Sequence, residues 1–413
     1  MVFFYFSNIC ILLEIIASFA ILLKKTGNLL NPALFFGFFI YVPFIMQTLN
    51  LSVYQQMTTP PMISFVFLFS SSVVLFYSLI FKIRASNFYI NITAKLIFLS
   101  VVFCLSFLVT YLVENFQLSN SFVPILQGLD IHLDGIRGLR EYNSIMRMFV
   151  PIFSFYMYKE CKKNIFLIFY VLSLLVPLTR GSRSSVMIAI IGALVLTVYE
   201  VKLKTFVKIF VLGVLLVNIF VSVGNIRISE NHTANTYGRL IGLNDDFYNY
   251  NSFGEIFSWY YGYYGLSYYN LQTSYSTWNR NPQMYYGLVN TYGVTKAIGV
   301  GKYIPNYPTD VEITARQTII GGAANVCTAF YFYLMDFGPL GMIVLDLIFI
   351  SIIFYVFSKS ISSRYFRFWY SILLIHIIIF AFYSSFYSIM MWPMIMLVTL
   401  FGVIAKKKLI ITK

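Results

Sequence analysis

The feature that most constrains this chain is its long apolar runs without charge. Residues 29–81 contain no Lys, Arg, Asp or Glu, and neither do residues 368–405. Only 11% of the 413 residues are charged, whereas soluble domains carry about 25%. A helix needs an apolar run of about 20 residues to cross the hydrocarbon core of a bilayer. The sequence therefore predicts an all-α polytopic integral membrane protein embedded in the lipid bilayer.

About eleven transmembrane helices, within a range of about 10–12, are predicted from these runs. They are residues 2–23, 29–46, 62–81, 96–113, 144–158, 165–178, 186–199, 209–223, 340–357, 368–383 and 389–405. The cations between them sort to one side, where 18 basic residues accompany only Glu160 and Glu200. Basic loops stay in the cytoplasm, so the N-terminus is predicted outside and the C-terminus inside. The net charge of +14 then reports topology, and no nucleic-acid partner is expected.

Two predicted outer loops are long, residues 114–143 and residues 224–323. The chain accordingly divides into an N-terminal bundle of about eight helices at 1–223, a large external loop at 224–323, and a C-terminal part at 324–413. Residues 325–341 are predicted to form a short surface helix, because a crossing there would turn the later cation clusters outward. The Gly338–Pro339 pair is expected to interrupt the helix.

The outer side of this topology holds nine arginines and only two lysines. Arginine makes bidentate contacts with phosphate and carboxylate groups, so some of these arginines are expected to face an anionic substrate. The alternative is that each pairs with one of the eleven outer acids. The nine are Arg137, Arg140, Arg147, Arg180, Arg183, Arg227, Arg239, Arg280 and Arg316.

Two pairs of these arginines have helical spacing. Arg180 and Arg183 lie in the sequence TRGSRSS, where one span ends and the next begins, and are expected on one side of the following helix near its positive end. Arg140 and Arg147 are seven residues apart, on one helical face at the mouth of the fifth span. For this second pair, interface anchoring by snorkelling is the alternative.

Candidate bases are the alternating residues Asp130, His132 and Asp134, together with Glu255. A solvated loop is the alternative for the alternating set, and no metal site is predicted. Glu14 and Asp346 lie inside predicted spans, where a carboxyl either has a function or is hydrogen-bonded between helices.

The large loop is rich in aromatic residues, including Tyr260 and Trp278. Residues 254–269 are expected to form an amphipathic helix at the headgroups. The aromatic side chains suit sugar stacking, and an aromatic belt at the interface is the alternative.

In these features the chain resembles the Wzy family of O-antigen (oligosaccharide repeat-unit) polymerases. The resemblance lies in eleven-odd spans with one large external loop, in the TRGSRSS element at residues 179–185, and in the loop exit at residues 325–341. Arg227 and Gly238 also match one Arg-x10-Gly motif of some members, and the sequence contains no second copy that we recognise.

The resemblance implies a fold like that of the GT-C glycosyltransferases and an enzyme of the bacterial inner membrane. It would join undecaprenyl-pyrophosphate-linked oligosaccharide units at the periplasmic face, without a cofactor, in partnership with a chain-length regulator. Arg180 and Arg183 would hold the donor pyrophosphate, and the other arginines, with Tyr260 and Trp278, would close the site and bind substrate. The alternatives are an O-antigen ligase and a flippase or other transporter of lipid-linked oligosaccharides. A transporter would explain the acids Glu14 and Asp346 inside predicted spans.

Overall fold

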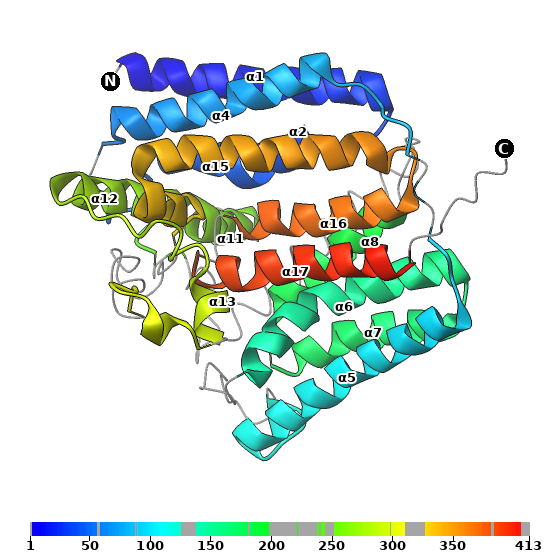
Figure 1. Ribbon diagram of the computed structural model, residues 1–413. Helices are drawn as coiled ribbons and strands as arrows, with labels where there is room; N and C mark the ends of the chain where they lie inside the picture. Colours follow the sequence, from blue (N-terminus) through cyan, green and yellow to red (C-terminus); the bar gives the residue numbers. More distant parts are fainter. Residues whose placement is uncertain are drawn as a thin grey trace. The chain divides into compact units, whose positions relative to one another are not determined.

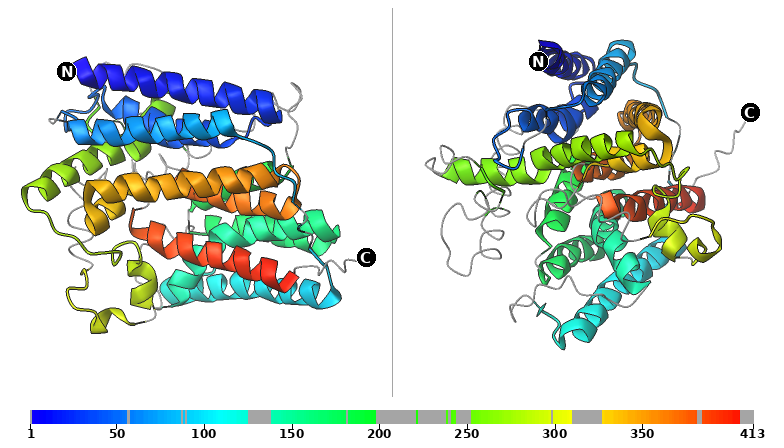
Figure 2. Two further views of the ribbon diagram at one scale, coloured as in Figure 1. Left: turned by 45° about the horizontal axis from the view of Figure 1, so that its top comes forward. Right: turned by 90° about the vertical axis from the view of Figure 1, so that its left-hand side faces the viewer.

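The computed structural model describes residues 2–55, 58–86, 88, 90–124, 138–180, 182–197, 221, 238, 241–243, 252–297, 299–309, 327–380 and 384–405. Within these ranges the regular elements are all helical, and the one β-type feature is an isolated antiparallel bridge between Ser52 and Leu243. Figures 1 and 2 show this all-helical architecture. The predicted all-α class is therefore confirmed for the described part of the chain.

The helices follow the apolar runs closely. They are α1 (Val2–Thr26), α2 (Pro32–Phe36), the π-helix η1 (Gly37–Tyr41), α3 (Val42–Gln47), α4 (Pro61–Ile80), α5 (Ala94–Ser119), α6 (Leu139–Cys161), α7 (Asn164–Leu178), α8 (Arg183–Thr197), α11 (Ser252–Tyr260), the π-helix η4 (Tyr261–Gly265), α12 (Leu266–Arg280), α13 (Tyr292–Ala297), the 3-10 helix η5 (Gly301–Tyr303), α15 (Phe330–Ser360), α16 (Arg364–Ile379) and α17 (Ser384–Ala405).

Four of these helices are long and apolar enough to cross a membrane: Phe6–Thr26, Pro61–Ile80, Ala94–Ser119 and Phe330–Ser360. Shorter apolar helices cover Pro32–Gln47, Asn164–Leu178, Ser185–Thr197 and Trp392–Ala405. All the predicted spans coincide with described helices except residues 209–223, of which only Val221 is described. The structure thus places the apolar helices, and the number of crossings stays a prediction.

The chain forms two compact units, each assembled from separate stretches of sequence. Unit 1 comprises residues 1–81, 200–354 and 376–388, and unit 2 comprises residues 82–199, 355–375 and 389–413. This division differs from the three predicted consecutive segments, because contacts join helices that are distant along the chain.

In unit 1, α1 lies along α4, as Figure 2 shows, and η4 with α12 packs on α3. The helix predicted over residues 254–269 exists as α11, η4 and the start of α12. Its aromatic side chains form a core with Ile241 and Leu243, in which Trp259 and Tyr261 are buried. Packing within the protein therefore covers Trp259 and Tyr261, and the position of this helix at the headgroups stays a prediction.

A kink in α15 confirms the break predicted at Gly338–Pro339. Gly338 has φ 67° and ψ −164°, a conformation that favours glycine, and a Cβ there would lie 3.1 Å from the indole of Trp278. Just before the kink, Asp336 accepts hydrogen bonds from the backbone N–H groups of Val289 and Asn290 at 2.9 and 2.7 Å. The side chains of residues 329–336 are buried within unit 1, and the place of this helix at the outer membrane surface stays a prediction.

In unit 2, α6 packs against α5, α7 and α8, and Figure 1 shows α5, α6 and α7 side by side. Helix α6 begins after Gly138, whose φ of 86° turns the chain and whose N–H donates to the Glu141 carboxylate at 2.6 Å. Further along α6, the Tyr156 ring stacks on Phe368 of α16, with centroids 4.6 Å apart. These contacts fix α6 as the central helix of the unit.

Candidate anion-binding site at the α7–α8 turn

A tight turn joins α7 to α8. The backbone N–H groups of Arg180 and Ser182 both donate to the carbonyl of Pro177, at 3.2 and 3.0 Å. Helix α8 begins only at Arg183, so Arg180 lies in the turn and not on the helix. The prediction that Arg180 and Arg183 share one side of α8 is therefore wrong, because the helix starts one turn later than the spacing argument assumed.

Arg180 is paired with an acid of this chain. Its Nη2 lies 2.8 Å from Oε2 of Glu114 on α5, and the side chains are 14% and 1% exposed. Its Nε donates to Oδ1 of Asn115, and its guanidinium lies over the ring of Tyr111, 4.2 Å from the centroid. The anion expected at Arg180 is thus supplied by Glu114, and the guanidinium is held on several sides.

The Glu114 carboxylate is itself positioned by α6. Asn143 donates from Nδ2 to Oε2 of Glu114 at 2.8 Å, and Thr110 donates to Oδ1 of Asn143 at 2.9 Å. The other oxygen, Oε1, is buried and has no hydrogen-bond partner in the described part of the chain. A buried ion pair is stable only when further hydrogen bonds compensate its desolvation, and the asparagines do so here.

Arg147 lies on α6 one turn beyond Asn143 and has a different environment. Its Nη1 donates to Oγ of Ser182 at a long 3.4 Å, and Ser182 shares a hydrogen bond of 2.8 Å with Ser185. Its Nε is buried without a partner, and among the described residues no carboxylate lies within ion-pair distance of it. Arg147 is therefore a half-buried cation whose charge the described residues leave unmatched.

Together these groups provide what an anion needs. The site offers the Arg147 guanidinium, the hydroxyls of Ser182 and Ser185, and the positive N-terminal end of the 15-residue helix α8. Arg180, whose charge Glu114 matches, is fixed in orientation by the same turn. Donors fixed in advance stabilise a developing negative charge without reorganisation.

The remaining predicted arginines are scattered. Arg140 lies in the first turn of α6, on the same helix as Arg147, as predicted. Arg183 is the first residue of α8, and Arg280 is the exposed last residue of α12 in unit 1. The others lie outside the described residues: Arg137, Arg227, Arg239 and Arg316.

Of the predicted bases, Asp130, His132 and Asp134 lie outside the described residues, and Glu255 is placed in α11 by its backbone. The two aromatic candidates have packing contacts. Tyr260 donates its hydroxyl to the carbonyl of Phe38 and lies 5.1 Å from the Phe38 ring, and burial raises the pKa of Tyr260.

Trp278 is 8% exposed and donates from Nε1 to the carbonyl of Gln283 at 3.0 Å. Trp278 is therefore buried and Tyr260 half-buried in unit 1, and their part in binding substrate stays a prediction.

Sequence reasoning missed the acid that matters most, Glu114. It was assigned to the start of an outer loop, whereas α5 continues to Ser119. Tyr111, Glu114 and Asn115 have i, i+3 and i+4 spacing and therefore share one helix face. Glu114 and Asn115 continue the helix face of Tyr111, and this spacing could have predicted that α5 extends past residue 113.

The carboxyls inside predicted spans are both hydrogen-bonded between helices. In unit 1, Glu14 accepts from the hydroxyls of Ser71 and Ser72 at 2.5 and 2.8 Å, and Asp346 accepts from Ser70 at 2.5 Å. Three consecutive serines of α4 thus donate hydrogen bonds to the two carboxyls. Of the two predicted explanations, the structure shows the hydrogen bond between helices.

The fold and site together define an all-helical protein with helices apolar enough to cross a membrane and with arginines gathered at a helix turn. Comparisons with protein-family models, curated proteins and solved structures find no match.

Proposed function

We propose that this protein is a glycosyltransferase that polymerises undecaprenyl-pyrophosphate-linked oligosaccharide repeat units. It would act at the periplasmic face of the bacterial inner membrane, in the synthesis of O-antigen or another surface polysaccharide. The growing chain moves from its lipid pyrophosphate onto the terminal sugar of an incoming lipid-linked unit.

The observation that carries this proposal is the contrast between Arg180, which Glu114 neutralises, and Arg147, which faces hydroxyl groups. In the transfer, the bond between the anomeric carbon and a pyrophosphate oxygen breaks, so negative charge grows on the leaving group. A guanidinium already in place binds such oxygens in bidentate fashion. The charge of Arg147, which no carboxylate of the described residues matches, suits an anion that arrives with the substrate.

The depth of Arg147 supports a substrate whose charged group enters from the membrane. Arg147 and Lys159 are twelve residues apart on α6, which corresponds to roughly 18 Å of helix axis. The hydrocarbon core is about 30 Å thick. If Lys159 lies at the cytoplasmic headgroups, as the cation distribution predicts, Arg147 lies below the outer headgroups. An unmatched cation at that depth is costly unless an anion compensates it.

The proposed roles follow from this placement. Arg147 and Arg183 would contact the pyrophosphate, and Arg180, neutralised by Glu114 and held by Asn115, would keep the α7–α8 turn in place. The new bond forms between the acceptor hydroxyl oxygen and the anomeric carbon. The hydroxyl proton goes to a base from the outer loops, for which Glu255 and the set Asp130, His132 and Asp134 remain the candidates.

The test is Arg147→Lys, which keeps the positive charge and removes the planar guanidinium that binds two oxygens at once. We expect polymerisation to fall on the order of 10²–10³-fold at an unchanged protein level. The readout is the length of surface polysaccharide in a strain that expresses only the variant. Lys302→Gln, which removes an exposed outer cation of unit 1, is the matched control. Normal chain lengths with Arg147→Lys would contradict the proposed role.

A further inference from the structure

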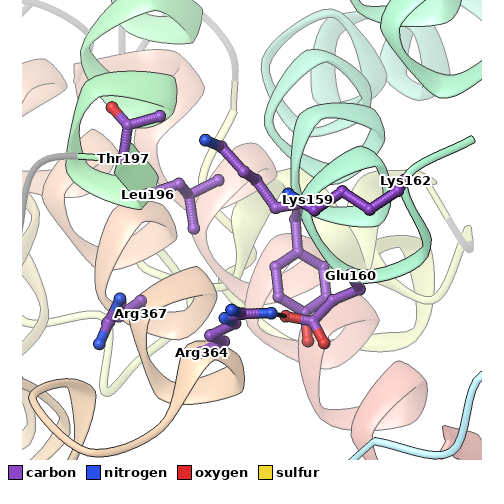
Figure 3. A pocket seen from close by; sticks show the side chains of 8 residues that line it. Lys159, Glu160, Lys162, Leu196, Thr197, Arg364 and Arg367 are labelled. Carbon is purple, nitrogen blue, oxygen red and sulfur yellow. Dashed lines mark ion pairs between the residues drawn. The ribbon is translucent and has the colours of Figure 1, made fainter. Parts of the chain in front are cut away.

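A second polar region lies at the other end of α6, among residues predicted to be cytoplasmic. There a pocket of about 190 Å³ opens between the last turns of α6 and α8 and the first turn of α16, all in unit 2. Figure 3 shows side chains from these three helices around it. The charged ones are Lys159, Glu160 and Lys162 of the α6 end and Arg364 and Arg367 of α16.

The pocket has an excess of positive charge. Among the described residues, four cations line it together with the carboxylate of Glu160, and Nη1 of Arg364 lies 3.8 Å from Oε1 of Glu160. Burial, with Lys162 and Arg364 nearby, lowers the pKa of Lys159. Like charges crowd one another here, so an added anion would be stabilised.

The pocket also contains groups held in place for a ligand. Arg367 is fixed by hydrogen bonds from Nε to the carbonyl of Ser360 at 2.9 Å and from Nη2 to that of Ile361 at 3.3 Å. The hydroxyl of Tyr156, a lining residue that is 1% exposed, has no hydrogen-bond partner among the described residues. The 16-residue helix α16 adds the positive end of its dipole. A buried hydroxyl that no described residue bonds, close to several cations, can donate a hydrogen bond to an anion.

We propose that this pocket binds the phosphate of an anionic phospholipid headgroup. A lipid is favoured over a free phosphate because an apolar surface begins directly beside the cations. Helix α7 starts two residues after Lys162, and its side chains Ile165 and Ile168 are 40% and 53% exposed. Basic residues at a helix end followed by exposed apolar side chains match a headgroup and its acyl chains. The proposal is independent of the polymerase function.

The experiment measures binding of short-chain lipids to the purified full-length protein by calorimetry. The probes are dihexanoyl phosphatidylglycerol, dihexanoyl phosphatidylcholine and inorganic phosphate. We expect the wild type to prefer phosphatidylglycerol. Each cation near a membrane surface contributes roughly fivefold to such binding, so Lys159→Gln with Arg364→Gln should weaken it on the order of 20-fold.

Two further variants keep the test sharp. Lys82→Gln with Lys95→Gln removes the same charge from exposed positions of unit 2 outside the pocket, and should leave the affinity unchanged. Glu160→Gln removes the competing carboxylate and should raise the affinity roughly fivefold. If Lys159→Gln with Arg364→Gln fails to fold, the affinity of Glu160→Gln for phosphatidylglycerol tests whether the pocket binds the headgroup.

Three results would overturn the proposal. One is phosphatidylcholine binding as tightly as phosphatidylglycerol. Another is inorganic phosphate binding as tightly as phosphatidylglycerol, which would make the pocket a free-anion site. The third is an affinity that Glu160→Gln leaves unchanged or lowers.

Discussion

The two halves of α6 hold positive charge in different ways. In its N-terminal half, Arg147 lies beside a turn where Arg180 is bound at 2.8 Å to Glu114, a carboxylate that is 1% exposed. At its C-terminal end, Arg364 of α16 is 64% exposed and lies 3.8 Å from Glu160. Arg180 is thus locked by an ion pair and hydrogen bonds, whereas Arg364 is loosely paired and largely solvated.

The difference shows what each region is suited to do. A transition state needs charge that is already in position, because reorganisation at the moment of reaction costs free energy. A phospholipid headgroup is attracted by positive charge near the membrane surface, whether or not each cation is fixed. Under the two proposals, the same residue types would serve catalysis in one half of the helix and lipid contact at its other end.

The largest effect is expected where the locked pair is broken. Glu114→Gln leaves Arg180 without its counter-charge in a largely buried setting, and should cost about 3–5 kcal/mol of stability. Thermal unfolding of the purified protein measures this. Combining it with Arg180→Gln should recover part of the loss, since both charges are then gone. An unchanged melting temperature for Glu114→Gln alone would show that the pair is not the anchor of the turn.

Next in size is Arg183→Lys at the start of α8. Lysine keeps the charge but not the planar fork, so polymerisation should fall on the order of 10²-fold while the protein level stays normal. Surface polysaccharide chain length is the readout. Wild-type chain lengths in this variant would remove Arg183 from the proposed site.

The sequence predicted much of the fold and only part of the site. Apolar runs locate helices because each helix must satisfy its own backbone in lipid, and Gly338–Pro339 marks a kink because of local backbone chemistry. The Arg180–Glu114 pair joins residues 66 positions apart and depends on how α5 packs beside the α7–α8 turn. Local patterns carry no information about such packing, so Arg180 was predicted as a free substrate contact.

A smaller change in stability is expected at the ion pair of Arg364 and Glu160. Arg364→Gln removes a partner of Glu160 that is largely solvated, so the stability should change by less than about 1 kcal/mol. The comparison with Glu114→Gln under the same melting conditions separates locked from loosely held charge. Equal losses at the two positions would abolish the distinction.

The smallest effect concerns pH. Burial raises the pKa of Glu160, and Arg364 offsets this in part. A carboxyl with a raised pKa in the folded state favours folding below its ordinary value of 4.5, and this contribution is lost as the pH rises through the raised value. Glu160→Gln should flatten the melting temperature profile in that acidic window. A profile identical to that of the wild type would show that Glu160 titrates normally.

The most direct test of the proposed function is a gel of surface polysaccharide from a strain that lacks this gene. A polymerase predicts that the ladder collapses to core with a single repeat unit, because units are still made, flipped and ligated but no longer joined. Loss of every sugar unit from the core would contradict the account and point to a ligase or a flippase. Long polymer left on its lipid carrier would then identify the ligase.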